Sequence, residues 1–515
     1  GGSYSSIGGI YMTGKSTFAM TSGSVTGNAA TETSGVWPET SDLWLGSEVV
    51  GTISGGTVGK VFVNANSSAM VGAGLTVSQA EGATTMITQV YLEADDGYTS
   101  KLTKSGGTIT TLKIAQDMDS THASVQTISN PTNGTYGSYS KVAKIGETYY
   151  DDLATAIGAA QANNTVKLLK DISNLDISSV EKNNGYYTVN KAITIDGDGH
   201  TITVTAGSKT SGDTWDKDNG RAHVFNVTAG DVTITNLTID GGGSDKSRSG
   251  INVYQANNVT LNNVTVKNCS VGVTVNASIV TADGLKTSGN KWSDDDQQGV
   301  NVDNGGASIT VTDTGSNATS IAEAIKVEGG SATLNSGNYG SLEVTDGAGT
   351  ITKATGVTLA APEGYYWKND TLTKAVATVT VGTGDGAVTT SYDSLADAFA
   401  KANEAGGTVK LYQDVEIDGT VTINKAVTIE SKTGSTYSIK ASGSFTTGSG
   451  NAGNCLLNVT STGDLTLKNV KVDASGKTTR VILCTSGKLN IDGATVTGGS
   501  YSSIGGIYMT GKSTF

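Results

Sequence analysis

The sequence predicts an all-β solenoid: tandem parallel β-helices, each with a short N-terminal capping α-helix. Three observations carry this prediction. Val, Ile and Thr recur in short alternating runs in a chain of 515 residues that has 69 Gly and only 3 Pro. These runs repeat at nearly constant spacing. The first eighteen residues return at the end of the sequence, and self-similarity at a fixed period is typical of repeat architectures.

The strand prediction depends on alternation of apolar and polar residues. The runs 232–239 and 259–266 align at an offset of 27 residues, and the runs 465–472 and 489–496 align at 24. Each run has aliphatic residues at alternate positions and Asn or Gly at a constant place. Such a pattern indicates coils of short strands around an aliphatic interior, stacked one strand spacing apart.

Composition excludes several classes of protein. The formal net charge is −13 and lysines are scattered singly, so no basic stripe is available for nucleic acid. No apolar run approaches the roughly 18 residues of a membrane span. Apolar residues make up 36%, which suits a solenoid that buries a few aliphatic residues per coil. The length predicts several domains or a repeat array.

The duplication defines a long period. Residues 1–18 and 498–515 are identical, which gives a period of 497 residues. If the period continues, Phe515 is followed by the equivalent of Ala19, and the chain is one repeat plus an overlap. The alternative is an artificial duplication. The strand-like run 488–498 resembles 17–27, which favours a true repeat whose coils continue across the join.

A weaker repeat within the period predicts the domains. The segment that begins at Tyr150 matches the one that begins at Tyr392. Both have helical spacing of apolar residues, so capping helices are expected over about 150–162 and 392–404. The predicted helix core residues are Leu153, Ile157, Leu395 and Phe399. The expected domains are 141–376, complete with a closing hairpin at about 362–374; 377–515, the start of a second domain; and 1–140, the end of such a domain from a preceding repeat.

These motifs resemble a known family. The helix, the following Thr-Val-x-Leu-x-x-Asp and the run Ala-Ile-Thr-Ile-Asp-Gly-Asp-Gly-His-Thr-Ile at 192–202 are similar to pectate-lyase-like right-handed β-helix domains in large surface proteins of Gram-positive gut bacteria. The resemblance implies a secreted, extracellular or cell-surface protein and a helix that caps the N-terminal mouth of each β-helix. It implies a fold and not an activity.

Enzymes with this fold place acids, bases and cations together, and the sequence shows no such set. Asp294, Asp295 and Asp296 predict a solvated turn, with a weak cation or sugar site as the alternative. The three arginines, Arg221, Arg248 and Arg480, are isolated from one another. His122, His200 and His223 are too separated for a metal site or a triad, and His200 is expected in a turn. We therefore predict no catalytic residue, no metal and no cofactor.

Cysteines and sequons have structural interpretations. Cys269, Cys455 and Cys484 are expected to be buried free thiols, with a Cys455–Cys484 disulfide as the alternative. Sequons are either glycosylation signals or turn asparagines that stack into a ladder, and the second interpretation is favoured. The sequons considered are at Asn226, Asn236, Asn258, Asn263 and Asn458.

Four tryptophans are the candidate glycan contacts: Trp37, Trp44, Trp215 and Trp292 lie in segments that break the coil pattern. Packing of a loop onto the sheet is the alternative role. The leading functional prediction is a structural or adhesive tandem-repeat shaft of an extracellular surface protein or filament. Its expected partners are adjacent repeats and host or bacterial glycans. The alternatives are a glycan-binding surface module and, less favoured, a polysaccharide lyase or hydrolase.

Overall fold

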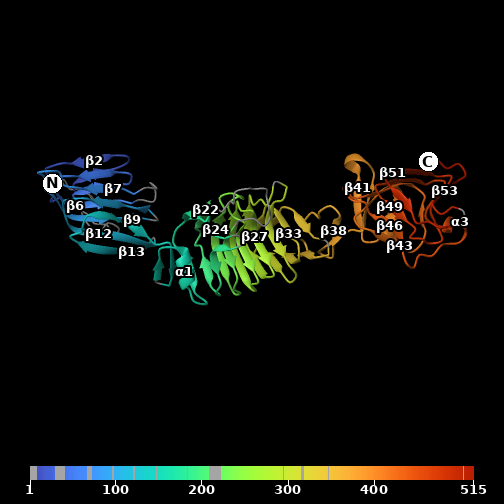
Figure 1. The fold of residues 1–515 in the computed structure, drawn as a ribbon, viewed down its shortest axis with the longest axis horizontal. Helices are drawn as coiled ribbons and strands as arrows, with labels where there is room; N and C mark the ends of the chain where they lie inside the picture. Colours follow the sequence, from blue (N-terminus) through green and yellow to red (C-terminus); the bar gives the residue numbers. More distant parts are fainter. Residues whose placement is uncertain are drawn as a thin grey trace. The chain divides into compact units, whose positions relative to one another are not determined.

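A computed structural model describes the chain except for residues 1–7, 29–40, 66–71, 96–97, 120–121, 147, 182–183, 208–221, 294, 315–317, 346 and 503. It consists of two compact units, Gly1–Gly340 and Ser341–Phe515. Both are built almost entirely of strands, most of which pair in parallel; Figure 1 shows them as arrows. The prediction of an all-β chain is confirmed, and the parallel sheets are consistent with a β-helix. The predicted boundaries at 140 and 376 stay predictions.

The first stack, residues 10–140, has two long sheets. One consists of β1 (Ile10–Met12), β4 (Leu43–Leu45), β6 (Gly56–Val63), β8 (Thr85–Leu92) and β12 (Thr108–Asp119) in parallel, followed by antiparallel β13 (His122–Ser129). The other consists of β2 (Thr17–Met20), β5 (Val50–Ile53), β7 (Gly74–Val77) and β11 (Lys101–Lys104) in parallel, then antiparallel β14 (Gly134–Gly137). The short strand β3 (Ser24–Val25) pairs with β6. Three other short strands are β9 (Ala94–Asp95), β10 (Tyr98–Thr99) and β15 (Tyr139–Ser140).

The second stack, residues 143–339, begins with β16 (Ala143–Ile145), β17 (Thr148–Tyr150) and helix α1 (Leu153–Ala159). Its coils then pair in parallel on three faces. Face A consists of β18 (Thr165–Leu168), β21 (Thr194–Asp196), β24 (Thr233–Asp240), β26 (Val259–Lys267), β28 (Ile279–Asp283), β31 (Ser308–Thr312) and β34 (Gly330–Leu334). Face B consists of β19 (Ile172–Asp176), β22 (Thr201–Ala206), the second halves of β24 and β26, β29 (Lys286–Ser288), β32 (Ser320–Ile321) and β35 (Asn338–Tyr339).

Face C is the third face of the second stack. It consists of β20 (Gly185–Val189), β23 (His223–Val227), β25 (Ser249–Tyr254), β27 (Val271–Asn276), β30 (Gln298–Asp303) and β33 (Ala324–Val327). Side chains alternate in and out along each strand. One inward row is Phe225, Ile251, Val273, Val300 and Ile325, all fully buried and in register. Each such side chain contributes about 1.5–3 kcal/mol by burial, so these rows hold the coils together.

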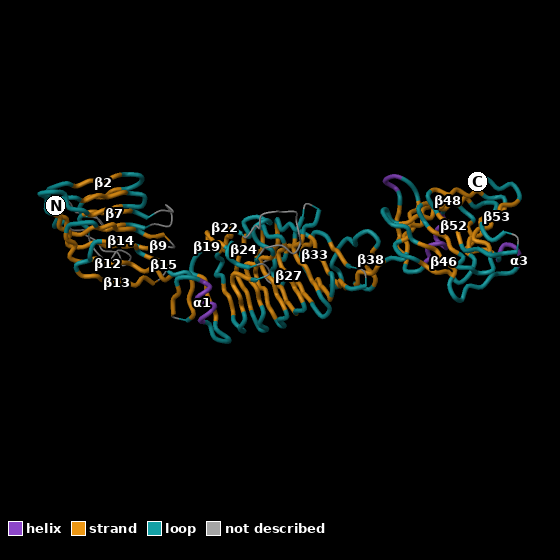
Figure 2. Tube along the Cα trace, in the orientation of Figure 1, coloured by secondary structure: helices purple, strands orange, loops and turns teal. Residues whose placement is uncertain are grey.

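The second compact unit begins with β36 (Leu342–Val344), β37 (Gly349–Lys353) and the antiparallel hairpin β38 (Tyr365–Lys368) and β39 (Thr371–Lys374). The hairpin occupies the range that the sequence predicts for it. Next come β40 (Ala377–Val381) and β41 (Val388–Tyr392), which pair antiparallel, and helix α2 (Leu395–Ala405). Figure 2 shows both α1 and α2 in purple among the strands.

The third stack, residues 377–515, again has three parallel sheets. The first contains β42 (Gly407–Leu411), β45 (Ala426–Ser431), β48 (Asp464–Lys468) and β51 (Lys488–Asp492). The second contains β43 (Val415–Ile417), β46 (Ser438–Ala441), β49 (Lys471–Asp473) and β52 (Thr495–Thr497). The third contains β44 (Val421–Ile423), β47 (Cys455–Val459), β50 (Arg480–Thr485) and β53 (Ile507–Thr510), and a short α3 (Gly450–Gly453) precedes β47.

Both helices begin at side-chain caps. The Asp152 carboxylate accepts a hydrogen bond of 2.7 Å from the Thr155 amide, and the Ser394 hydroxyl accepts one of 3.4 Å from the Asp397 amide. Such caps satisfy amides that the first helical turn leaves without partners. Neither helix has the length and apolar character needed to cross a membrane, and the same is true of every helix among the described residues.

Several asparagines form turn ladders as predicted. Asn236 and Asn263 have φ values of 51° each, and the Asn263 amide donates a hydrogen bond of 3.0 Å to the Asn236 side chain. Asn258 also has a left-handed φ of 60°. The prediction is wrong for Asn226 and Asn458, which lie inside strands β23 and β47 rather than in turns.

Candidate functional site

The outer surface of face C has a row of polar side chains. One outward residue of each strand lies in register with the next, and the row consists of Asn226, Asn252, Thr274, Asn301 and Lys326. A second outward row lies beside it and consists of Tyr254, Asn276 and Asp303. Because strands of a coil stack are about 4.8 Å apart, the rows present polar groups at nearly regular intervals.

These rows line a groove of about 1050 Å³ on the second stack. We call it the face C groove. Besides the two rows, its lining includes His223, Arg248, Trp292, Asp296 and Gln298. Most ligand pockets are lined by apolar side chains, whereas this groove is lined by amides, hydroxyls and charges. A polar, hydroxyl-rich ligand is the kind that such a surface accommodates.

Amide side chains bond along the row. The Asn252 amide donates a hydrogen bond of 2.8 Å to the Asn226 carbonyl oxygen one coil earlier. The Asn301 amide donates one of 3.1 Å to the Glu328 carboxylate one coil later. These bonds orient the amide groups, so that each side chain is held in one rotamer along the groove.

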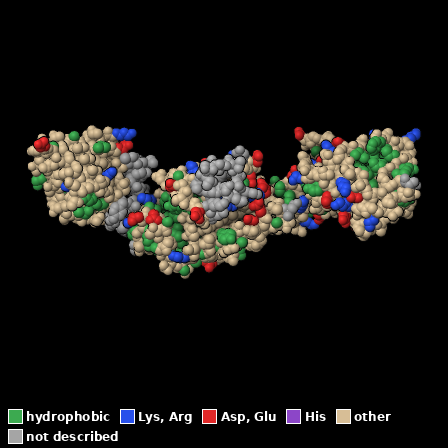
Figure 3. All heavy atoms as spheres, in the orientation of Figure 1, with side chains coloured by type: hydrophobic (Ala, Val, Ile, Leu, Met, Phe, Trp, Pro, Cys, Tyr) green, Lys and Arg blue, Asp and Glu red, His purple; other side chains and the backbone are tan. Residues whose placement is uncertain are grey.

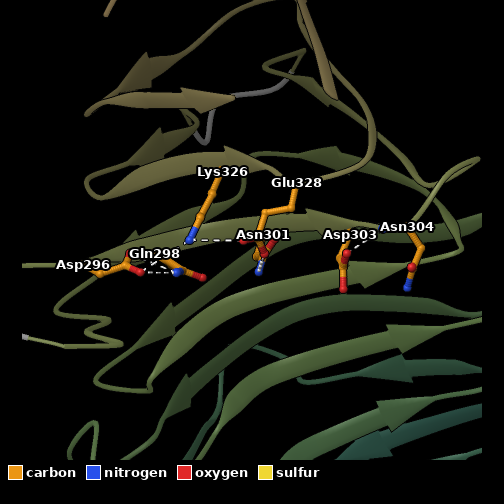
Figure 4. A network of polar contacts seen from close by, with 7 residues as sticks. All are labelled: Asp296, Gln298, Asn301, Asp303, Asn304, Lys326 and Glu328. Atoms are coloured by element: carbon orange, nitrogen blue, oxygen red, sulfur yellow. Dashed lines mark hydrogen bonds and ion pairs between the residues drawn. The ribbon is translucent and has the colours of Figure 1, made fainter. Parts of the chain in front are cut away.

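A charged cluster lies at the end of the row, and Figure 4 shows it. The Lys326 ammonium lies 3.5 Å from the Asp296 carboxylate and 3.3 Å from the Glu328 carboxylate. The Gln298 amide donates to both oxygens of Asp296, at 2.9 and 2.8 Å. Asp303 accepts a hydrogen bond of 2.7 Å from the Asn304 backbone amide.

Three polar atoms of the groove lining are buried without a hydrogen-bond partner among the described residues. They are the side-chain oxygens of Gln298 and Asn301 and the Nδ1 atom of His223. A buried polar atom without a partner costs roughly 1–3 kcal/mol. The two amide oxygens are acceptors, so a ligand that donates hydrogen bonds would satisfy them.

His223 is neutral in this environment. Its side chain is 4% exposed. Burial, together with the charge of Arg248, lowers the pKa of His223 from 6.5 to about 3. The groove therefore has two cations, Arg248 and Lys326, and three carboxylates, Asp296, Asp303 and Glu328. It has no excess of positive charge that would hold a polyanion.

One aromatic side chain belongs to this surface through a charged neighbour. The Arg248 guanidinium lies 5.8 Å from the centre of the Trp292 ring, within the range of a cation–π contact. Tyr254, 44% exposed, adds a second ring to the lining. Aromatic rings with an exposed face are typical of sugar-stacking surfaces.

The other predicted tryptophans are elsewhere. Trp37 and Trp215 lie outside the described residues. Trp44 is only 6% exposed and stacks on Phe62 with the ring centres 4.0 Å apart. It lies in strand β4 and not in a segment that breaks the coil, so its role is the packing alternative.

The predicted helix core residues are buried where expected. Leu153 and Ile157 of α1 are 1% and 5% exposed, and Leu395 and Phe399 of α2 are 6% and 3% exposed. Helix α1 contacts β16, β17, β18 and β20, and α2 contacts β40, β41, β42, β44 and β45. Each helix thus packs on the early strands of its own stack.

The acidic triplet forms a turn. The amides of Trp292 and Ser293 both donate to the Asp296 carbonyl, at 2.9 and 3.0 Å. Asp295 is exposed, Asp296 faces the groove, and Asp294 lies outside the described residues. His200 is a turn residue, 3.2 Å from the Asp171 carboxylate. Among the described residues, no group of three or more His, Cys, Asp or Glu side chains is arranged to hold a metal.

All three cysteines are buried free thiols. In the strand register Cys455 lies beside Arg480, while Cys484 lies beside Val459. The two cysteines are therefore at different positions of their coils, and the alternative of a stacked disulfide is wrong. Coil spacing alone suggested it, because one bulge or turn residue shifts the register.

Sequence reasoning missed most of the groove. His223, Arg248, Asn252, Asn301 and Lys326 were not identified as a site. A signal was present: the triplets Phe-Asn-Val, Ile-Asn-Val, Val-Thr-Val, Val-Asn-Val and Ile-Lys-Val, starting at 225, 251, 273, 300 and 325, repeat an apolar-polar-Val pattern at coil spacing. Their middle residues form the row.

Comparison with known proteins gives little. No family model matches this chain. No curated protein matches it at a significant level. A solved PL6 family alginate lyase is 12% identical, and the alignment covers 95% of this chain and 72% of that chain with a TM-score of 0.16. A TM-score this low supports no inference about fold or function.

Proposed function

We propose that this chain is a structural and adhesive segment of an extracellular surface protein or filament, built of tandem 497-residue repeats. In this proposal each stack is a right-handed parallel β-helix, and α1 and α2 cap the N-terminal mouths of two of them. The resemblance to pectate-lyase-like surface domains belongs to the same proposal. The partners are adjacent repeats and glycans.

The observation that carries the proposal is that the duplicated segment folds alike in both places. Gly14 and Gly511 have left-handed φ values of 62° and 71°. The Ser16 hydroxyl donates a hydrogen bond of 2.6 Å to the Thr13 carbonyl, and Ser513 makes the same bond, also 2.6 Å, to Thr510. An artificial extension would have no reason to adopt a coil of the adjoining stack.

Inward side chains also match. Ile10 and Met12 pack against the core of the first stack, while Ile507 and Met509 pack against the core of the third. Ile504 is 37% exposed, and its counterpart Ile7 lies outside the described residues. The two copies thus have the same inward residues wherever both are described, as a true repeat requires.

Peptide mapping of the native protein tests the tandem repeat. A peptide that joins Lys512-Ser-Thr-Phe515 directly to Ala19-Met-Thr-Ser is the expected result. Peptides that continue from Phe515 into a different sequence, with none that join it to Ala19, would contradict the proposal.

The face C groove favours a second function, glycan binding. Two buried acceptor oxygens, on Gln298 and Asn301, lack partners among the described residues, and sugar hydroxyls are donors. The near balance of charge favours neutral glycans over polyuronates. Trp292 and Tyr254 would supply stacking surfaces.

Binding to an array of neutral and acidic glycans tests this function. We expect retention of neutral oligosaccharides, with weak dependence on salt because few ion pairs are involved. Binding only to acidic glycans, lost at high salt, would contradict the groove as its site.

A further inference from the structure

The first and third stacks each have an edge strand at the duplicated segment. Strand β1 pairs only with β4, and β53 pairs only with β50, among the described residues. Edge strands present backbone N–H and C=O groups that can pair with another strand. Tyr11 on β1 is 57% exposed and Phe515 is 76% exposed. Figure 3 shows hydrophobic side chains gathered where the unit carries β51 and β53.

We infer that the partner of the β51 and β53 edges is the first stack of the following period, in a register that the duplicated segment defines. This inference rests on the proposed tandem repeat. In it, β53 of one period and β1 of the next are one strand, so β4 of the following period pairs with β53 on its free side. Likewise, β2 of the following period pairs with β51.

The inward aliphatic rows continue through this join. In the third stack Leu457, Ile482 and Ile507 lie in one row. In the first stack Ile10, the counterpart of Ile507, is followed in its row by Leu43, Val61, Val90 and Leu112. Superposing Ile10 on Ile507 makes one uninterrupted aliphatic row.

A second inward row does the same. Val459, Cys484 and Met509 lie in register in the third stack. In the first stack Met12, the counterpart of Met509, is followed by Leu45, Val63, Leu92 and Ile114. Since a one-residue slip turns every side chain to the other face, agreement of both rows favours this register over its neighbours.

The other sheet already shows the start of the join. Thr514 pairs in parallel with Lys488 of β51, and the Leu489 amide donates a hydrogen bond of 3.0 Å to the Thr514 carbonyl. Thr17, the counterpart of Thr514, pairs with Val50 of β5. The joined sheet would therefore run from Lys488 through Thr514 to Val50 of the following period.

Aromatic side chains on the outer face give independent support. In the first stack, Tyr11, Trp44, Phe62 and Tyr91 form a ladder in register. Tyr11 lies edge-on to Trp44 at 6.2 Å, and Phe62 stacks on Tyr91 at 5.1 Å. The ladder begins at Tyr11, whose ring is exposed on the other side.

The counterpart of Tyr11 has a partner on that other side. The Arg480 guanidinium lies 4.8 Å from the Tyr508 ring centre and 4.1 Å from the Tyr501 ring centre. In the join, the Tyr508 ring would lie between Arg480 and Trp44 of the following period. A cation on one side and an aromatic edge on the other are both favourable for a tyrosine ring.

A cysteine pair in a two-period chain tests the register. The chain is residues 1–515 followed directly by residues 19–515, with Thr514→Cys in the first period and Val50→Cys in the second. The matched control is Thr17→Cys with Val50→Cys in the first period, because that pair is adjacent in β2 and β5. Neighbouring strands are about 4.8 Å apart, within disulfide reach, and the native cysteines are buried.

We expect the test pair to oxidise to the same extent as the control pair, as judged by mass spectrometry of non-reduced peptides. A control that forms beside a test pair that does not would overturn the register. Peptide mapping decides the tandem repeat separately. Mapping that shows the repeat, together with a failed test pair, removes this inference and leaves the shaft proposal standing.

Amide exchange gives a second measurement without substitutions. In the single chain, both copies of the peptide Ile-Gly-Gly-Ile-Tyr-Met-Thr, at 7–13 and 504–510, carry an edge strand. In the two-period chain the copy at the join would be paired on both sides. We expect a slowly exchanging population of this peptide that the single chain lacks, and exchange identical to that of the single chain would overturn the inference.

Discussion

Gln298 donates both hydrogens of its side-chain amide to the two carboxylate oxygens of Asp296, at 2.9 and 2.8 Å, and its own oxygen remains buried without a partner among the described residues. Asp296 is in turn 3.5 Å from the ammonium of Lys326. A carboxylate that positions an amide in this way presents a fixed acceptor to the face C groove. Fixed acceptors of this kind select ligands by the position of their hydroxyl groups.

Removing one acceptor should weaken glycan binding. Asn301→Ala deletes the unpartnered oxygen of Asn301, and a neutral hydrogen bond contributes about 1 kcal/mol. We expect the Kd to rise by roughly three- to tenfold, measured by titration calorimetry with the best glycan from the array. Asn262→Ala, at an exposed position of β26 on face A, is the matched control and should bind as the wild type does. Equal affinities for all three proteins would place binding elsewhere.

His223 should make the protein less stable in mild acid. Burial lowers its folded-state pKa to about 3, below the ordinary value of 6.5. The unfolded chain therefore binds a proton that the folded chain does not. The stabilising contribution is complete above about pH 6.5 and is lost as the pH falls towards 3. Between pH 6 and 5 the free energy of unfolding should fall by up to about 1.4 kcal/mol per pH unit more than in His223→Gln, measured by urea unfolding. Parallel pH profiles of the two proteins would contradict this account.

The capping helices should be essential for their stacks. Leu153→Asp or Leu395→Asp places a charge in a buried site and should cost about 3–5 kcal/mol. Ala154→Asp and Ala396→Asp are matched controls, since these exposed residues follow directly in the same first turn. The controls should leave the Tm nearly unchanged. Should the leucine variants melt with the controls, the helices would not stabilise the stacks.

The thiols should be inert in the folded protein. Burial raises the pKa of Cys455 to about 11 and that of Cys269 to about 12, so few thiolates form near neutral pH. We expect negligible reaction with an aromatic disulfide reagent in buffer at pH 7.5, and reaction of three thiols per chain after unfolding. Fast labelling of the native protein would show that a cysteine-bearing coil opens readily.

We expect no cleavage of pectin, polygalacturonate or a mucin glycan. Gln298 and Lys326 engage Asp296, and the balanced charge of the groove gives a polyuronate no anchoring cations in excess. Assays of ultraviolet absorbance and reducing ends would check this. Turnover that disappears when Asp294, Asp295 and Asp296 are all changed to Asn would establish an enzyme instead.

The sequence by itself determined the strand-rich character, the two helices and the inward rows. Alternation of Val, Ile and Leu with Thr and Asn is a local property of each run, and Leu153 with Ile157 or Leu395 with Phe399 mark one helix face. These patterns depend on the period of the backbone, which is the same in any coil. The duplicated segment was likewise visible without coordinates.

Only the tertiary structure decided which polar residues share a surface. Asn226, Asn252 and Asn301 are 26 and 49 residues apart in the sequence, and turns of unequal length between coils hide their common row. The same irregularity separates Cys455 from Cys484, whose spacing is that of a coil. Trp44 and Trp292 look alike in sequence, yet one ring is stacked inside an aromatic ladder and the other lines the groove. Register between coils arises from the packing of every inward side chain at once, so no single run contains it.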